Sequence, residues 1–237
     1  MNQADQRCIL LFVKHPEKGS VKKRLSEEIG ADAAVALYQN FVLDLLASVK
    51  GLSIPLWVCF YPPDDSKKFS LWLGTQYHLV PQEGKDLGER MKNAFSRAFE
   101  HDFRNVILMG SDIPDLPMEI MDEAFISLDT SDIVIGPACD GGYYLIGFRS
   151  DRFVPEIFEG ISWGTRTVLK ETLDICISQG ERVYTLPEWQ DVDTLSDLRD
   201  LEKRNRYTPF SCPGTMAYIS AHKDILREPN EGLNTWA

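Results

Sequence analysis

Short apolar runs rich in Ile, Val and Leu recur along the chain, and several of them lack the strict apolar–polar alternation of a half-exposed strand. Strands that are buried on both faces of a sheet have this pattern. The runs that we interpret as strands are residues 8–13, 56–61, 106–109, 133–135, 143–146 and 183–186.

Apolar residues at helical spacing separate these runs. One stripe is Val35, Tyr38, Val42, Leu45, Leu46 and Val49, and a second is Leu87, Met91, Ala94, Phe95, Ala98 and Phe99. Strands that alternate with helices of this length predict βαβ units and a mostly parallel sheet covered by helices. The expected fold class is therefore α/β, a three-layer α/β/α sandwich with a Rossmann-like sheet.

The pattern changes near residue 206. No internal repeat or Pro/Gly-rich linker divides the chain before that point, so we expect one domain over residues 1–206. Prolines and glycines interrupt the remainder, and residues 207–237 are expected to pack on the surface or on a partner subunit. The tail ends near Trp236, which could seat on a neighbouring chain and form a homodimer.

Composition narrows the classes of function. The formal net charge of -11 disfavours nonspecific binding to nucleic acid, whose phosphates repel an acidic surface. No run of about 18 apolar residues predicts a membrane span, and the first residues lack the pattern of a secretory signal, so we expect a cytoplasmic protein. The five cysteines form no CxxC pair, which gives no sign of a disulfide framework or a zinc site.

A basic cluster follows the first predicted strand. Residues 14–24 carry five Lys or Arg and one Glu in an otherwise acidic chain, and a helix is expected to begin near Val21 or Lys22. Lys14, Lys22 and Arg24 in such a loop suit the phosphates of a di- or triphosphate. The sequence matches neither a P-loop nor a dinucleotide-binding fingerprint. The alternative is a solvated basic start of a helix.

An aspartate follows the apolar run 106–109, in the sequence Gly110-Ser-Asp-Ile-Pro114. Ligands of open parallel sheets bind at the carboxyl ends of the strands. Asp112 would then project into a cleft and offer a hard oxygen ligand to Mg²⁺ or Mn²⁺ on a nucleotide phosphate. A turn or capping role for Asp112 is the alternative.

Two further clusters could contribute to a site. Asp140, Gly141, Gly142 and Tyr143 allow a ligand to approach the backbone and a ring, although Asp-Gly between two β-rich runs also predicts a plain hairpin. Residues 191–194, Asp-Val-Asp-Thr, begin a predicted helix that Thr194 and Asp197 could cap. A phosphatase of the haloacid-dehalogenase class is disfavoured, because its nucleophilic aspartate follows the first strand.

Trp163 and Thr165 precede another predicted helix. Thr165 or Ser162 could cap that helix, and Trp163 could form one wall of a cleft. A structural role is the preferred interpretation for both.

The ordered motifs resemble one family. They are Lys14-x-Pro-x-x-Gly19-x-Val-Lys22-x-Arg24-Leu, Gly84-x-Asp-Leu87-Gly88-x-Arg90-Met, Gly110-Ser-Asp112-x-Pro, Gly136-Pro-Ala-x-Asp140-Gly-Gly-Tyr143, Trp163-x-Thr and Asp191-x-Asp193-Thr. Together they resemble the selenodomain-associated, radical-SAM-associated glycosyltransferase-like family of the nucleotide-diphospho-sugar transferase superfamily. The resemblance covers about residues 8–204. It departs from the family pattern at Lys23, where threonine is usual.

The resemblance implies a type A glycosyltransferase fold, with a nucleotide at the first loop and a divalent metal, Mg²⁺ or Mn²⁺, at the aspartate of a strand end. Asp112 and Asp193 would be the metal ligands, with Asp191 next. The implied nucleotide-binding residues are Lys14, Gly19, Lys22, Arg24, Gly84, Leu87, Gly88 and Arg90. The implied acceptor-binding residues are Asp140, Gly141, Gly142, Tyr143 and Trp163.

These assignments predict a transferase in which Arg24, Asp112 and Asp140 are the candidate catalytic residues. Two reactions would use the same groups. The main prediction is metal-assisted glycosyl transfer from a nucleotide sugar, which releases a nucleoside diphosphate. The alternative is nucleotidyl transfer from an NTP to a phosphorylated or sugar-like acceptor, which releases pyrophosphate. A noncatalytic nucleotide-binding module is the third hypothesis.

Overall fold

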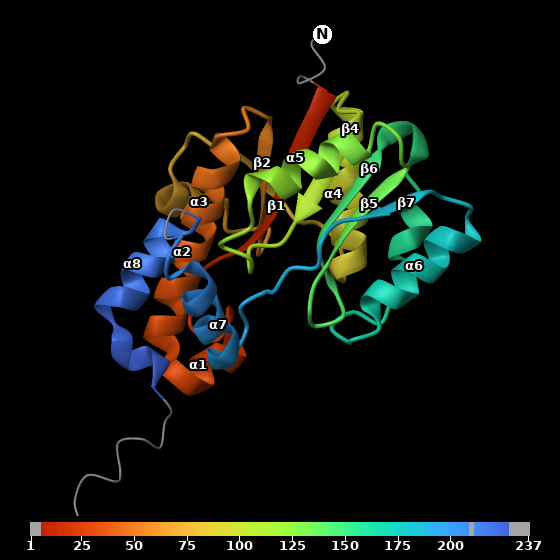
Figure 1. Cartoon of the computed structure of the whole chain (residues 1–237). Helices are drawn as coiled ribbons and strands as arrows, with labels where there is room; N and C mark the ends of the chain where they lie inside the picture. Colours follow the sequence, from red (N-terminus) through yellow and green to blue (C-terminus); the bar gives the residue numbers. More distant parts are fainter. Residues whose placement is uncertain (1–5, 209–210, 228–237) are drawn as a thin grey trace, which may run out of the picture.

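A seven-stranded sheet runs through the centre of the computed structural model, which describes residues 6–208 and 211–227 (Figure 1). The strand order is β3-β2-β1-β4-β6-β5-β7. Four of the six neighbouring pairs are parallel, while β6 is antiparallel to both β4 and β5. The bounds are β1 Arg7–Lys14, β2 Leu56–Tyr61, β3 His78–Pro81, β4 Asn105–Met109, β5 Ile133–Pro137, β6 Tyr143–Arg149 and β7 Val183–Thr185.

All six predicted strands are present, and the prediction of a mostly parallel α/β sheet is confirmed. The sequence pattern missed β3, which has only four residues and ends at a proline. This strand pairs with β2 alone, at the edge of the sheet, where a proline is tolerated. The Asp-Gly signal after β5 forms a hairpin, since β5 and β6 pair antiparallel across it.

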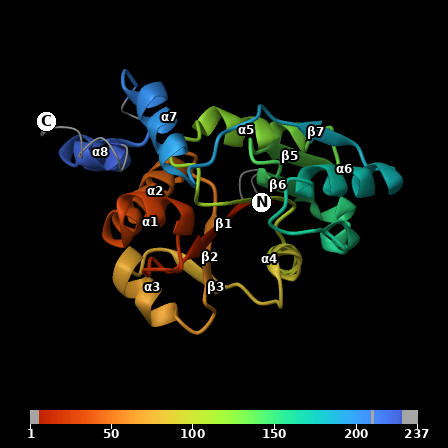
Figure 2. The same cartoon turned by 90° about the horizontal axis from the view of Figure 1, so that it is seen from below.

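Helices cover both faces of the sheet, which gives the three predicted layers (Figure 2). The helices α2 (Ala31–Lys50), α3 (Ser66–Leu73) and α5 (Met118–Ser127) pack on one face. The helices α4 (Leu87–Glu100) and α6 (Val168–Ser178) pack on the other. Both predicted helical stripes lie in these layers, on α2 and α4.

A third cluster of helices packs against α2, away from the sheet. It comprises α1 (Lys23–Ile29), α7 (Leu195–Asn205) and α8 (Pro213–Ala221). The carboxylate of Asp44 on α2 accepts hydrogen bonds from Gly214 N, Thr215 N and Thr215 Oγ1, at 2.9, 2.8 and 2.6 Å. The first part of the predicted extension therefore packs on its own chain, and Trp236 lies outside the described residues.

Within the described residues, α2 is long and apolar enough, by length and composition, to cross a membrane, which the sequence pattern did not indicate. Nine of its residues are buried in the fold, and they contribute to two of the apolar clusters. The packing of α2 is that of a core helix.

The structure confirms one predicted helix start and corrects another. Thr194 and Asp197 form a capping box at the start of α7, as predicted. The helix expected at Trp163 and Thr165 begins instead at Val168. Glu171 accepts hydrogen bonds from Ser162 N and from Thr167 Oγ1, both at 2.7 Å, and this holds the preceding residues in a turn.

Candidate functional site

A cavity of about 960 Å³ opens at the carboxyl ends of β1 and β4. Figure 2 looks toward this end of the sheet. Residues from the first loop, from the strand ends and from the segment before α7 share its wall, so the structure brings together side chains that are far apart in the sequence. The predicted site residues that line it are Lys14, Lys22, Arg24, Leu87, Arg90, Asp112, Asp140, Gly142, Tyr143, Trp163, Asp191 and Asp193.

Lys22 lies between the two predicted metal ligands. Its Nζ forms ion pairs with Asp112 and with Asp193 Oδ1, the latter at 2.9 Å. The lysine side chain is only 2% exposed, whereas the side chains of Asp112 and Asp193 are 45% and 40% exposed toward the cavity side. The ammonium also lies 5.6 Å from the centre of the Phe41 ring. One buried cation thus joins two carboxylates that are 81 positions apart in sequence numbering.

The charges around Lys22 control its protonation. Burial alone lowers the pKa of the ammonium, but the carboxylates of Asp112 and Asp193 outweigh burial and raise it. For Asp193, burial raises the pKa, and the neighbouring Lys22, Arg24 and Lys14 lower it further than burial raises it. The ion pair is therefore charged on both sides at neutral pH.

Lys22 has an unusual backbone conformation. The residue is in the left-handed region, with φ of 47° and ψ of 48°, directly before α1 begins. This conformation is uncommon for a residue with a side chain and persists where surrounding contacts hold it. Here the ion pairs with both aspartates provide those contacts.

Lys14 and Arg24 have no ion-pair partner within the parts of the chain that the structure describes, residues 6–208 and 211–227. Both side chains line the cavity and are exposed. Their charges are therefore available to an anion in the cavity.

Tyr38 connects the first strand with the Asp112 loop. Its Oη accepts a hydrogen bond from Lys14 N at 2.9 Å and shares a second one with Ser111 Oγ, also at 2.9 Å. Burial and the nearby Asp112 raise the pKa of Tyr38, so the hydroxyl stays protonated. The sequence showed Tyr38 only as part of an apolar helical stripe, because its hydroxyl partner is 73 positions away.

Asp140 and Asp191 bring further negative charge to the cavity. Burial, together with the charges of Asp140 and Asp193, raises the pKa of Asp191 to about 6. Asp140 Oδ1 accepts a hydrogen bond from Gly142 N at 2.8 Å, which is the turn role that the hairpin interpretation predicts. The other oxygen of Asp140 has no partner among residues 6–208 and 211–227.

The oxygen ligands present suit a hard divalent cation. Within the described chain no group of three or more His, Cys, Asp or Glu side chains is arranged to hold a metal ion. Asp112 and Asp193, however, already converge on one cation, the Lys22 ammonium. Mg²⁺ is commonly held by one or two carboxylates, with phosphates and waters completing its shell. This pair fits such a requirement.

Four of the predicted glycines do not line the cavity: Gly19, Gly84, Gly88 and Gly141. Two of them allow close packing behind the wall. A Cβ on Gly88 would lie 2.9 Å from the Trp163 ring, and a Cβ on Gly141, where φ is +92°, would lie 2.3 Å from Arg166 O. These glycines shape the cavity without facing a ligand.

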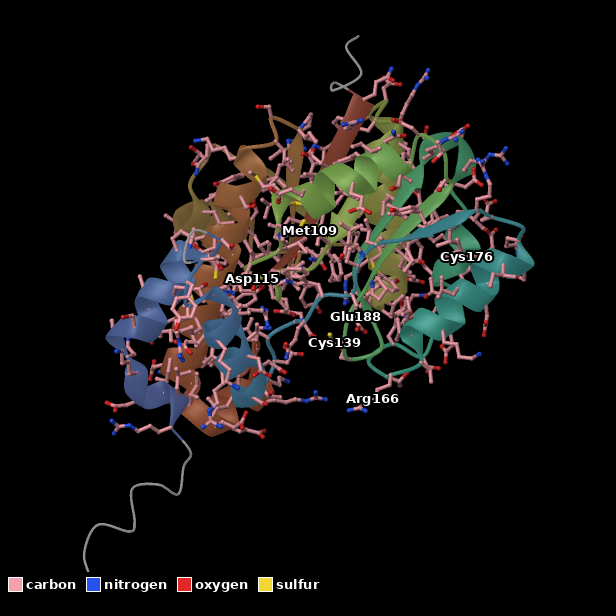
Figure 3. All side chains as sticks on the ribbon, in the orientation of Figure 1. Met109, Asp115, Cys139, Arg166, Cys176 and Glu188 are labelled. Carbon is pink, nitrogen blue, oxygen red and sulfur yellow. The ribbon has the colours of Figure 1, made fainter. Side chains whose placement is uncertain are left out.

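The wall opposite the basic loop is formed by α4, the β5–β6 hairpin and the turn before α6. Trp163 and Tyr143 meet edge to face, with ring centroids 6.4 Å apart. Arg90 lies over the Tyr61 ring at 4.8 Å. Arg166 also lines this wall, and Figure 3 shows it at the lower end of the molecule.

Sequence reasoning missed several lining residues. Arg166 lay beside the predicted helix start and drew no interpretation. Gln82 is 5% exposed and donates from Nε2 to Cys59 O at 2.7 Å, at the end of the missed strand β3. Because the strand before it was missed, the sequence held no signal for Gln82.

The chain has relatives of known sequence and structure. A family described as "Uncharacterized protein conserved in bacteria (DUF2064)" matches residues 45–165, about half of the chain. A solved structure of a proposed nucleotide-diphospho-sugar transferase from Desulfovibrio desulfuricans G20 is 44% identical. The two structures superpose with a TM-score of 0.90, over 94% of this chain and 97% of that one.

A curated relative is the 2-phospho-L-lactate guanylyltransferase of Methanocaldococcus fervens, which is 25% identical over 145 residues. The match includes 61% of this chain and 63% of the relative, so the chain spans about three fifths of that protein's length. A nucleotidyl transferase from Methanothermobacter is similar in structure, with a TM-score of 0.58, 13% identity and coverage of 86% of this chain and 99% of that one. At this identity the similarity shows the fold alone.

Proposed function

Because the chain belongs to the bacterial family described as DUF2064 and has the nucleotide-diphospho-sugar transferase fold, we propose that it is a nucleotidyltransferase. The substrate would be an NTP, and the acceptor a small molecule with a phosphate or hydroxyl oxygen. This is the second of the two reactions that the sequence suggested. The curated guanylyltransferase relative supports it over glycosyl transfer.

One observation carries the proposal: Lys14, Lys22 and Arg24 share a cavity with Asp112 and Asp193 at the carboxyl ends of β1 and β4. The exposed cations Lys14, at the end of β1, and Arg24, in the first turn of α1, would hold the triphosphate. The volume of about 960 Å³ is at the upper end of the range for small-molecule sites of roughly 300–1,000 Å³, enough for a nucleotide and a small acceptor.

In the proposed reaction an acceptor oxygen attacks the α-phosphorus of the NTP. A bond between that oxygen and phosphorus forms, the bond from the α-phosphorus to the bridging oxygen breaks, and pyrophosphate leaves. Arg24 and Lys14 would stabilise the charge that develops on the phosphate oxygens. The acceptor would lie near Asp140 and Tyr143, on the opposite wall.

We propose Asp112 and Asp193 as the holders of a Mg²⁺ or Mn²⁺ ion, with Asp191 adjacent. When bound, such an ion would neutralise charge on the pyrophosphate oxygens. The protein side chains would fix the orientation of the triphosphate, and Tyr38 would hold Ser111 and the first strand in place next to Asp112.

Glycosyl transfer from a nucleotide sugar is the second candidate, because the relative that is 44% identical is described as a proposed nucleotide-diphospho-sugar transferase. The finer assignment to the selenodomain-associated group stays a prediction that rests on the motifs.

The two reactions differ in the product they release. The chain would be incubated with each of the four NTPs, and separately with nucleotide sugars, in the presence of Mg²⁺ or Mn²⁺ and a panel of phosphorylated and hydroxylated acceptors. Nucleotidyl transfer predicts pyrophosphate release that requires both NTP and acceptor, whereas glycosyl transfer predicts release of a nucleoside diphosphate.

The two variants to compare are Asp112→Asn, in the proposed site, and the control Asp224→Asn, at an exposed residue of the last short helix that does not line the cavity. Asp112→Asn should lose the activity and Asp224→Asn should keep it. Nucleotide binding with no release of either product would favour a noncatalytic binding module and overturn the proposal.

A further inference from the structure

Asp115 is a buried carboxylate next to the proposed site that takes no part in the reaction described above. It follows Asp112 by three residues and is 3% exposed. Its Oδ1 accepts hydrogen bonds from Trp189 Nε1 at 3.2 Å and Arg204 Nη2 at 3.0 Å. Its Oδ2 accepts from Arg204 Nε and Asn205 Nδ2, both at 2.6 Å.

These four bonds occupy both oxygens of Asp115, so the carboxylate is not available to a metal or a substrate. They connect three separate segments: the loop after β4, the segment that begins at Trp189, and the last turn of α7. Figure 3 labels Asp115 to the left of the centre, toward the part of the molecule where Figure 1 shows α7.

The segment that carries Asp193 is tied to the same group at further points. Arg204 donates to Gln190 O at 3.2 Å and to Gln190 Oε1 at 3.1 Å. Val192 N donates to the carbonyl oxygen of Asp112 itself, at 2.9 Å. The residue before Asp193 is therefore bonded to Asp112 directly, and Arg204 joins the Asp115 carboxylate to the backbone of Gln190 in the segment that carries Asp193.

We propose that Asp115, with Arg204, is a positioning residue that sets the relative placement of Asp112 and Asp193, and so determines the affinity of the site for a divalent cation with its nucleotide. The inference rests on the proposed function, since it assigns a role toward the metal ligands named there. Groups that orient metal ligands from behind typically change metal affinity by about 10–100-fold when they are replaced.

The alternative role for Asp115 is structural support alone, and the chain offers a matched control for it. Asp44 is also buried, at 5% exposed, and also accepts hydrogen bonds on both oxygens, from Gly214 and Thr215. It caps α8 and does not line the cavity. Asp115→Asn and Asp44→Asn thus remove the same charge from two comparable networks, of which one touches the proposed site.

The experiment measures the free Mn²⁺ signal by electron paramagnetic resonance during titration of each full-length variant, with and without NTP, at a temperature where circular dichroism shows the variant folded. We expect Asp115→Asn to weaken Mn²⁺–NTP binding by at least about 10-fold. Asp44→Asn should change the affinity for Mn²⁺–NTP by less than about 2-fold, even if its melting temperature falls as much as that of Asp115→Asn. Arg204→Lys keeps the charge but loses the two-pronged contact, and should weaken binding in the same direction.

Equal Mn²⁺–NTP affinities for wild type, Asp115→Asn and Arg204→Lys would overturn the positioning role and leave the proposed function standing. No Mn²⁺–NTP binding by the wild type would overturn both. If Asp115→Asn does not fold, Arg204→Lys decides the question; if neither folds, the role is structural and the inference is wrong.

Discussion

Replacing Lys22 by methionine tests whether the Asp112–Asp193 pair is a cation site. The substitution keeps most of the side-chain length and removes the charge that joins the two carboxylates. In the free protein the ammonium serves as the cation of this pair. We expect the variant to be less stable without a divalent cation, and to bind that cation more readily than the wild type.

The size of the stability change follows from the burial of the three groups. Removing one partner of a fully buried ion pair costs about 3–5 kcal/mol, whereas an exposed pair contributes about 0–1 kcal/mol. Lys22 is 2% exposed but Asp112 and Asp193 are 45% and 40% exposed, so water can solvate the carboxylates that remain. We expect a loss of about 2 kcal/mol, which for a domain of this size lowers the melting temperature by roughly 4–8 °C.

Although Lys22→Met lowers stability, it should raise the affinity for a divalent cation. A divalent cation that enters the wild-type site must displace a positive charge or lie within a few ångströms of it, and at an effective dielectric constant of about 20 that repulsion amounts to several kcal/mol. Lysine can move away, so we take a tenfold gain, about 1.4 kcal/mol, as the minimum for Lys22→Met in the absence of nucleotide.

The assay compares thermal melting of wild type and variant with and without Mn²⁺, together with direct Mn²⁺ titration. Lys23→Met is the matched control, because Lys23 lines the same cavity but forms no ion pair with either aspartate. Mn²⁺ should stabilise Lys22→Met more than the wild type or Lys23→Met. Equal stabilisation of all three proteins, or no loss of stability in metal-free Lys22→Met, would show that Lys22 does not occupy a cation site between the two aspartates.

Three further outcomes follow from single groups. Hydrogen bonds from Arg182 hold the pKa of Asp132 at about 2, below its ordinary 3.8, so this pair stabilises the fold above about pH 4 and the contribution is lost as the pH falls toward 2. In denaturant titrations Asp132→Asn should be destabilised by about 1–2 kcal/mol at pH 7, and its stability should change less than that of the wild type between pH 4 and 2. A pH profile identical to that of the wild type would count against this role. Gly88→Ala should lower stability by about 1–3 kcal/mol and shift Trp163 fluorescence, because the added Cβ would lie 2.5 Å from a backbone oxygen and 2.9 Å from the Trp163 ring. This steric clash outweighs the roughly 1 kcal/mol that alanine gains over glycine in a helix, and a more stable variant would contradict the packing. Arg24→Ala should change stability by less than about 0.5 kcal/mol, because Arg24 is exposed, and should weaken NTP binding at least about tenfold in an equilibrium binding assay. An unchanged affinity for NTP would show that Arg24 is not part of the proposed site.

The sequence predicted the sheet because buried parallel strands leave a strong local pattern. Six apolar runs became strands, and the two helical stripes became α2 and α4. The exception, β3, pairs with one neighbour only and contains His78 and Pro81, so little of it looks apolar. The strand forms because it pairs with β2, and the sequence of residues 78–81 alone does not show that pairing.

The candidate site was predictable to the extent that it follows strand ends. Asp112 and the basic loop could be placed near one another because the carboxyl ends of parallel strands meet at one edge of a sheet. What the sequence could not indicate was the pairing of side chains across long separations. Lys22 looked like a phosphate ligand on its own, and its ion pair with Asp193 spans 171 positions. The partners of Asp115 lie 74 to 90 positions further on, so the sequence showed no sign of its network.

A crystal structure of the protein with an NTP and Mn²⁺, with data collected to record the anomalous signal of manganese, would test directly whether Asp112 and Asp193 hold a divalent cation beside the nucleotide. We expect a manganese peak in contact with Asp112 and Asp193, with Lys22 displaced from between them and the phosphates in contact with Lys14 and Arg24. A nucleotide bound elsewhere, or Lys22 still bridging the two aspartates with NTP and manganese bound beside it, would show that the proposed metal site is wrong.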